Sequence, residues 1–216
     1  MLIKSIFTNS SGILFSRILG FIRDLLTASI LGANIYSDIF FVAFKVPNLF
    51  RRIFAEGAFT QAFIPAYAKS KHKIQFSSSI FLSFFAFIML LSLFVTLFSK
   101  FVTNFIAIGF DDKTVELTAP LLAINFYYLP MIFVVTFMAA LLQYKNHFST
   151  SAFSTALLNL SLIAALLISK DMDKYDITFY LSYGVLVGGA LQILVHILAL
   201  KNKNLLKVLS FNKIKF

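Results

Sequence analysis

Four long stretches of the chain hold no formally charged residue, and they constrain its fold more than any other feature. They cover residues 74–99, 117–144, 146–169 and 177–200. Each is longer than the ~20 residues with which an α-helix crosses a bilayer. Only 13% of the residues are charged, against roughly 25% in soluble domains. The sequence therefore predicts an all-α, polytopic integral membrane protein.

Two further apolar segments precede these stretches but are interrupted by charges. We interpret them as the first two of six transmembrane helices, which together form one lobe over residues 1–200. No small-residue cleavage site follows the first apolar run, and Arg17 would break a signal core, so the first span is expected to be uncleaved. The predicted spans are about 8–32, 35–66, 76–99, 118–143, 147–169 and 177–200.

The loops between these spans alternate in charge, which predicts the orientation. Lysines dominate the loops after spans two and four and the tail at 201–216, while acids gather near 111–116 and 171–176. Because cytoplasmic loops carry the lysine and arginine excess, both termini are predicted to be cytoplasmic. The tail, with five lysines among apolar residues, either contacts anionic headgroups or begins a longer chain.

Several functional classes fit poorly. The chain has no Cys, which excludes disulfides and thiolate metal sites, and its three His are scattered, which argues against a metal site. The net charge of +10 falls mainly in short loops, where it signals topology rather than nucleic-acid binding. No catalytic constellation lies within a span, so an enzyme is not expected.

The first two spans hold more positive than negative charge. Five cations face three anions, which leaves a surplus of two. An unpaired charge in a low-dielectric site is costly, so the surplus is expected to face water, lipid headgroups or an anionic ligand. The cations are Arg17, Arg23, Lys45, Arg51 and Arg52, and the anions are Asp24, Asp38 and Glu56.

Span one places its charges on more than one face. Arg17 and Asp24 are seven residues apart and share a face, whereas Arg23 points roughly 120° away from Arg17. Span one is therefore predicted to line a hydrated cavity or to bend near Gly20. The alternatives are side chains that reach toward the membrane surfaces and an internal ion pair.

Span two carries Pro47, which removes a backbone donor and disfavours helical geometry at the preceding residue. A kinked or interrupted helix is predicted there, as in transporters that build binding sites from broken helices. Simpler alternatives are a pair between Asp38 and Lys45, which share a face, and an ordinary i,i+4 pair between Arg52 and Glu56.

Smaller motifs favour helix packing. The run "YGVLVGGALQ" presents glycines at small-residue spacing. Gln192 and His196 lie four residues apart and are expected to make an interhelical hydrogen bond. Asn125 and Tyr127 precede Pro130, where a packing kink is favoured over a polar cavity.

The first third of the chain resembles the MurJ (MviN) family of lipid II flippases, within the multidrug, oligosaccharidyl-lipid and polysaccharide exporter superfamily. The matching pieces are "FSRILGFIRD", "SDIFFVAFKVPNLFRRIFAEGAF" and "QAFIPAYAK". Later pieces, such as "TALLNLSLI" and "GVLVGGALQ", are similar but less diagnostic.

The resemblance implies a transporter with two lobes around a cationic cavity, which moves lipid-linked peptidoglycan precursor from the inner to the outer leaflet of the bacterial cytoplasmic membrane. Arg17, Arg23 and Arg51 are expected to bind its diphosphate. The expected charge partners, which exchange as the cavity turns, are Asp24, Asp38, Arg52 and Glu56. No cofactor or metal is expected, and the membrane potential or a coupling cation would drive transport.

Family members have more than twice as many spans as we predict here. The resemblance therefore implies a second lobe, supplied by a longer chain, a partner chain or a second copy, and residues 201–216 would then begin the link. The alternative functions are export of another polyprenyl-linked saccharide and a truncated, non-transporting membrane scaffold.

Overall fold

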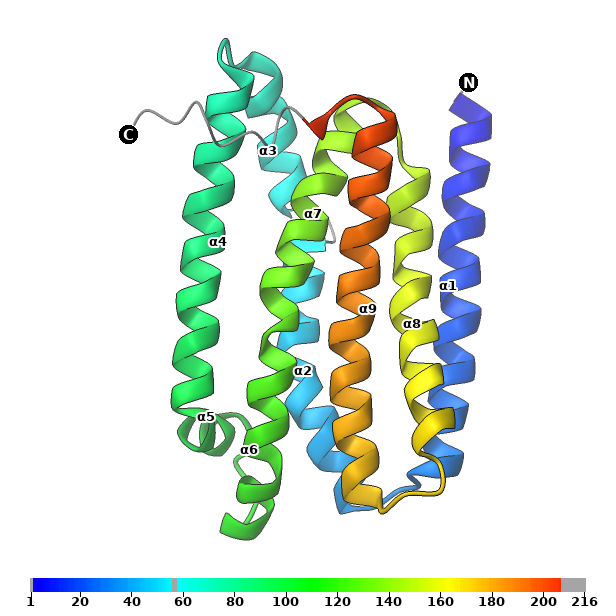
Figure 1. Ribbon diagram of the computed structural model, residues 1–216, viewed down its shortest axis with the longest axis vertical. Coiled ribbons are helices and arrows are strands. Elements are labelled where there is room, and N and C mark those ends of the chain that lie inside the picture. Colours follow the sequence, from blue (N-terminus) through cyan, green and yellow to red (C-terminus); the bar gives the residue numbers. More distant parts are fainter. Residues whose placement is uncertain (1, 56–57, 207–216) are drawn as a thin grey trace.

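The computed structural model describes residues 2–55 and 58–206, and this part of the chain is a bundle of helices (Figure 1). The predicted all-α fold is confirmed. The helices are α1 (Leu2–Ile30), α2 (Ile35–Ala55), α3 (Ala58–Lys69), α4 (Lys73–Leu97), α5 (Ser99–Ile106), α6 (Asp112–Phe126), α7 (Tyr128–Tyr144), α8 (Ser149–Ser169) and α9 (Lys174–Asn202).

Four helical segments within this described part are long and apolar enough to cross a membrane. They are Lys73–Leu97, Asp112–Tyr144, Ser149–Ser169 and Lys174–Asn202. Each coincides with one of the charge-free stretches. The first two predicted spans fall on α1 and on α2 with α3, which hold more charge, and the count of six stays a prediction.

The long helices run up and down, so the connections at one end carry a net positive charge and those at the other a net negative charge. The start of α1, the turn between α3 and α4 and the end of α9 lie together, while α5 lies across the opposite end (Figure 1). The first end carries the lysines of the α3–α4 turn and of the α9 terminus. The opposite end carries the acids of the α5–α6 and α8–α9 connections.

The centre of the bundle is α7, which is buried over most of its length. Phe133 and Phe137 of α7 meet rings from α3 and α4: the Phe63–Phe137 and Phe81–Phe137 centroids are 5.2 and 5.0 Å apart. Aromatic pairs of this kind contribute ~0.5–1.5 kcal/mol each beyond the area they bury. They attach α4, whose other side is exposed and apolar, to the core.

Glycines let α9 pack closely on its neighbours, as predicted. A β-carbon on Gly188 would lie 2.8 Å from Leu158 Cδ1 of α8, and one on Gly189 would lie 2.9 Å from Met131 Sδ of α7. The hydroxyl of Ser161 donates to the carbonyl oxygen of Gly184 at 2.6 Å. Lipid tails are as apolar as side chains, so close packing and such hydrogen bonds hold membrane helices together.

Prolines act differently in the two places where a break was considered. Helix α2 continues through Pro47, so no interruption occurs there; α2 ends later, at Ala55. The helix does break between α6 and α7, at Tyr127, because Pro130 has no N–H to offer the carbonyl of Phe126. Asn125, just before that break, is buried and donates to Ser182 Oγ at 2.8 Å, which favours the packing kink.

Candidate functional site

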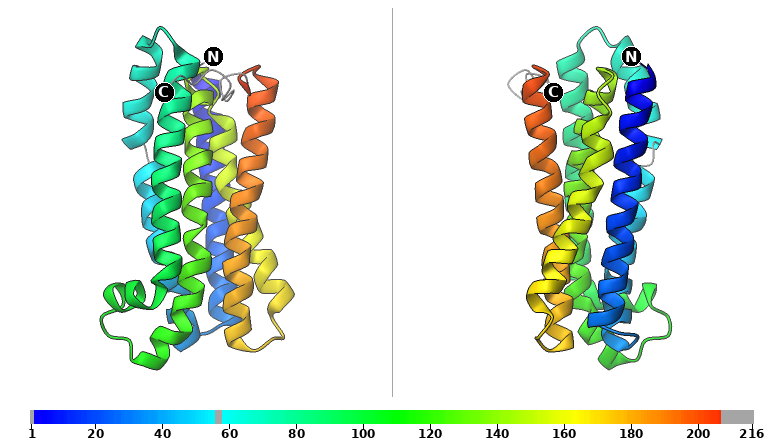
Figure 2. Two further views of the ribbon diagram at one scale, coloured as in Figure 1. Left: turned by 60° about the vertical axis from the view of Figure 1, so that its left-hand side comes forward. Right: turned by 90° about the vertical axis from the view of Figure 1, so that its right-hand side faces the viewer.

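A hollow of about 360 Å³ lies beside α1, between α2 and α8. Helix α1 packs along α8 (Figure 2), and the hollow is lined by residues of α1, α2, α8 and α9. One wall is polar and basic and the facing wall is aromatic. The polar wall includes Ser16, Arg17, Arg23 and Asn159, and the aromatic wall includes Phe40, Phe41 and Phe44.

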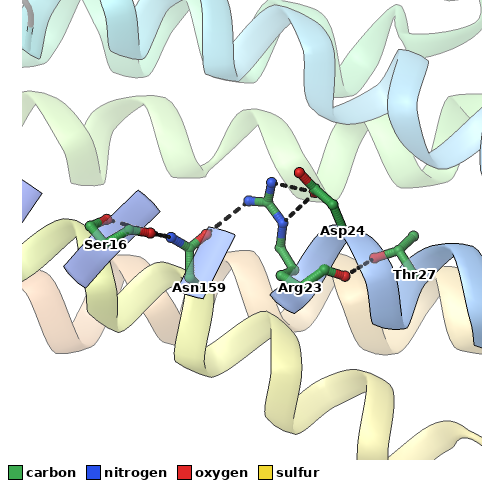
Figure 3. A network of polar contacts seen from close by, with 5 residues as sticks. All are labelled: Ser16, Arg23, Asp24, Thr27 and Asn159. Carbon is green, nitrogen blue, oxygen red and sulfur yellow. Dashed lines mark hydrogen bonds and ion pairs between the residues drawn. The ribbon is translucent and has the colours of Figure 1, made fainter. Parts of the chain in front are cut away.

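Arg23 is held by a chain of polar contacts across α1 and α8 (Figure 3). Its Nη2 lies 2.7 Å from Asp24 Oδ1, and its Nη1 donates to Asn159 Oδ1 at 2.9 Å. The amide nitrogen of Asn159 donates in turn to the carbonyl oxygen of Ser16 at 2.9 Å. The side chain of Arg23 is 25% exposed, whereas that of Asp24 is 61% exposed. The guanidinium is therefore oriented on two sides while it still borders the hollow.

Arg17 lines the same hollow, but no polar contact orients its side chain there. Its side chain is exposed, and within the described part of the chain it makes no hydrogen bond or ion pair. Gly20 separates the two arginines on this wall, and a β-carbon there would lie 3.5 Å from Asn159 Nδ2. The hollow thus has one neutralised cation, Arg23, and one uncompensated cation, Arg17.

A second hollow, of about 760 Å³, lies where α1 turns into α2. Asp24 and Asp38 both line it, and both are exposed. Thr27 and Phe41 line both hollows, so the acidic space adjoins the basic one. A cationic site and an acidic site therefore lie side by side along the last turns of α1.

The structure changes the predicted grouping of charges. Arg17 and Asp24 were expected on one face, but Asp24 pairs with its neighbour Arg23, and the two arginines share the hollow. Helical angles place Cβ atoms, and an arginine side chain is long enough to turn its guanidinium through much of the 120° between them. Of the alternatives for span one, an internal ion pair and a cavity both occur, and α1 continues through Gly20.

The other predicted pairings have different outcomes. Asp38 and Lys45 are both exposed and form no ion pair within the described residues. The side chains of Arg51 and Arg52 and the whole of Glu56 lie outside the described part, so their roles stay predictions. In the ranges 2–55 and 58–206, no group of three or more His, Asp or Glu side chains is placed to hold a metal.

Asn159 is a site residue that the sequence analysis missed. It is nearly buried, yet both ends of its amide are used, one on Arg23 and one on Ser16. The sequence did carry a signal: Asn159 is the one amide side chain of a predicted membrane span whose other polar residues within α8 are hydroxyls, and polar residues within the membrane usually have a partner or a function. The contact between α8 and α1 could not be predicted from the sequence, so the partner of Asn159 was not identified.

Gln192 lines the hollow and connects it to the core. The Tyr128 hydroxyl donates to Gln192 Oε1 at 3.2 Å, and Gln192 Nε2 donates to the Ser154 carbonyl at 3.1 Å. The interhelical hydrogen bonds expected here are thus made by Gln192. His196 instead bonds within α9, with its Nδ1 2.8 Å from the Gln192 carbonyl oxygen.

An apolar bundle with several helices of membrane-crossing length, and with a basic hollow between them, has the architecture of a polytopic membrane protein. Comparison with known proteins then gives the family: the profile described as "Lipid II flippase MurJ" matches residues 27–215. The chain belongs to the MurJ family of lipid II flippases.

Individual relatives agree with this assignment. A Helicobacter pylori protein named "Probable lipid II flippase MurJ" is 51% identical over 182 residues, covering 84% of this chain and 40% of that protein. A Buchnera aphidicola protein of the same name is 38% identical over 221 residues, covering 98% of this chain and 43% of its own. The chain thus spans less than half the length of these relatives.

A solved structure shows the same arrangement of helices. It is titled "Lipid II flippase MurJ, inward closed conformation", and it superimposes with a TM-score of 0.77 at 27% identity. The match covers 96% of this chain and 43% of that one. The helices described here therefore correspond to a part of a larger flippase fold.

Proposed function

We propose that the chain forms one lobe of a lipid II flippase, which moves the peptidoglycan precursor from the inner to the outer leaflet of the bacterial cytoplasmic membrane. The observation that carries the proposal is the pair Arg17 and Arg23 in one hollow, in a chain of the MurJ family. The diphosphate of the precursor supplies the anion that the unpaired Arg17 requires.

In this mechanism Arg17 and Arg23 bind the diphosphate while the polyprenyl tail stays in the bilayer. The planar fork of a guanidinium matches two phosphate oxygens at once. Arg17 has no ion-pair partner to give up among the described residues, so its interaction with the diphosphate is opposed only by the loss of its bound water. Arg23 must exchange its contact with Asp24, so its net contribution is smaller. From the family motif, Arg51 acts as the third diphosphate ligand.

The carboxylates act as exchange partners during transport. Asp24 takes Arg23 back when the diphosphate leaves, and Asp38, which shares the adjoining hollow, offers a second acceptor. Arg52 and Glu56 are the remaining charge partners that the family motif suggests. Such exchanges accompany the rocking of one helix bundle against another in alternating access.

The remaining parts of the proposal concern orientation, partner and drive. Both termini of this chain face the cytoplasm, following the lysine distribution. A second lobe, in a longer chain, a partner chain or a second copy, completes the cavity. The membrane potential acts on the cationic steps with ~2.3 kcal/mol per charge per 100 mV, and a coupling cation is the alternative drive.

Binding of lipid II to the purified chain tests the proposal. We expect Arg17→Ala to weaken binding about tenfold or more, the cost of losing a charged hydrogen bond, and Arg23→Ala to weaken it less. Lys170→Ala is the matched control, because Lys170 is an exposed cation that lines neither hollow. Circular dichroism confirms that each variant keeps its helices.

Two outcomes would replace the proposal. If the Arg17→Ala and Arg23→Ala variants bound lipid II as tightly as the unchanged chain, the cationic hollow would not be the headgroup site. A non-transporting membrane scaffold would then be favoured. Equal binding of an unrelated polyprenyl diphosphate saccharide, with the same dependence on Arg17, would instead favour an exporter of another lipid-linked saccharide.

A further inference from the structure

A groove of about 660 Å³ lies between α8 and α9, away from the arginine hollow. Its polar lining residues come from the start of α8 and the end of α9, which lie at the same end of the bundle as the start of α1 (Figure 1). None of the residues assigned above to substrate binding or charge exchange lines it.

The mouth of the groove is cationic and lacks a counter-charge. Lys203 and His147 both line it, and the positive charge of Lys203, after burial, helps to lower the pKa of His147 below its usual value. Every acid in the described part of the chain lies in the first two helices or at the opposite end. The mouth is therefore complementary to an anion.

Hydroxyl donors surround the same mouth. Ser149 and Thr150 begin α8, whose first turn has no side-chain cap. The Thr150 hydroxyl lies 2.8 Å from His147 Nε2, and the Ser149 hydroxyl lies 3.3 Å from the same atom. These side chains, together with Lys203, form a cluster of donors of the kind that binds phosphate oxygens.

The groove becomes apolar with depth. Leu157 lies eight residues into α8 from Ser149, and Val195 lies eight residues before Lys203 on α9. At 1.5 Å per residue both lie about 12 Å below the mouth. Leu198, between these levels, is 50% exposed at the surface of the bundle. A polar, basic mouth above an apolar floor open to lipid matches an amphiphile with an anionic head.

We propose that this groove binds an anionic glycerophospholipid of the membrane, with its phosphate at Lys203, Ser149 and Thr150 and an acyl chain along Leu157 and Val195. Basic pockets between transmembrane helices are known to hold anionic headgroups. Because the deeper part of the groove is apolar, it favours a lipid with an acyl chain over free phosphate. The site is separate from the arginine hollow and does not depend on the proposed transport function.

A tryptophan placed in the groove provides the test, since the chain contains none of its own. Leu198→Trp is reconstituted in phosphatidylcholine vesicles with increasing fractions of brominated phosphatidylglycerol or brominated phosphatidylcholine. We expect half-quenching at an about fivefold lower fraction of the anionic lipid, the factor for one lysine at a membrane surface. Phe87→Trp, on the lipid-exposed side of α4, should report no preference.

Charge variants then locate the headgroup. Lys203→Gln in the Leu198→Trp background should abolish the preference, whereas Lys201→Gln, an exposed cation outside the groove, should keep it. Equal quenching by both lipids, or a preference that survives Lys203→Gln, would overturn the assignment. So would displacement by millimolar inorganic phosphate or by the deacylated headgroup, because the site would then bind phosphate without the lipid.

Discussion

At the scale of single residues, the two arginines of α1 are in different electrostatic states although they border one hollow. Arg23 is bonded to Asp24 and Asn159, and Arg17 has neither partner. An arginine that is already paired is positioned, while an unpaired one is available to a ligand. The hollow therefore combines a fixed donor with a free one.

Removing the charge of Asp24 should release Arg23 to a ligand. We expect Asp24→Asn to raise the affinity of the purified chain for lipid II by at most about fivefold, because an exposed ion pair contributes only ~0.2–1 kcal/mol. Equilibrium binding in detergent micelles measures the change. Asp112→Asn removes an equal charge at the start of α6, where it lines neither hollow, and should have no effect. A weaker affinity in Asp24→Asn would contradict the exchange role.

At the scale of helices, the contact between α8 and α9 depends on the absence of a side chain. A β-carbon on Gly188 would lie 2.9 Å from Leu158 Cα, a backbone atom that cannot move aside cheaply. The neighbouring Ser161–Gly184 hydrogen bond requires the same close approach. The two helices that form the lipid groove are thus held at a distance fixed by glycine.

A paired substitution tests this contact. Gly188→Ala should lower the free energy of unfolding by about 1–3 kcal/mol, the usual cost of overpacking a core. Gly109→Ala is the control, because nothing lies within 4 Å of its β-carbon position. Thermal unfolding followed by circular dichroism compares the two. Equal unfolding midpoints for Gly188→Ala and Gly109→Ala would show that α8 and α9 can move apart without loss of stability.

The sequence predicted the helices whose signal lies within their own residues. It did not predict features that depend on which helices pack together. The charge-free runs located four membrane-crossing segments, because hydrocarbon excludes charge whatever packs nearby. Pro47 was expected to kink or interrupt its helix; α2 continues through it, so no interruption occurs at Pro47. The Arg23–Asn159 bond joins residues 136 positions apart, and no helical spacing predicts which helices meet.

At the scale of the whole molecule, charge is sorted between the two ends of the bundle. The described lysines of the α3–α4 turn and the α9 terminus are at one end, and the acids of the α5–α6 and α8–α9 connections are at the other (Figure 1). The positive end is expected to stay in the cytoplasm during insertion.

Cysteine labelling in whole cells tests this orientation without background, since the chain has no Cys. Lys113→Cys, beside the acids, should react with a membrane-impermeant maleimide in intact cells. Lys71→Cys, in the α3–α4 turn, should react only after the membrane is permeabilised. Labelling of Lys71→Cys in intact cells would reverse the predicted topology.

The way α1 is attached has a mechanical consequence. Helix α1 rests mainly on α8, where Gly12 brings it close to Ala152, and it has few contacts with other helices. Helix α8 is therefore the main support of the wall that carries Arg17 and Arg23, while the aromatic centre around α7 is built without α1. A change in how α1 lies against α8 would alter the width of the arginine hollow, and with it access to Arg17, before it disturbed that centre.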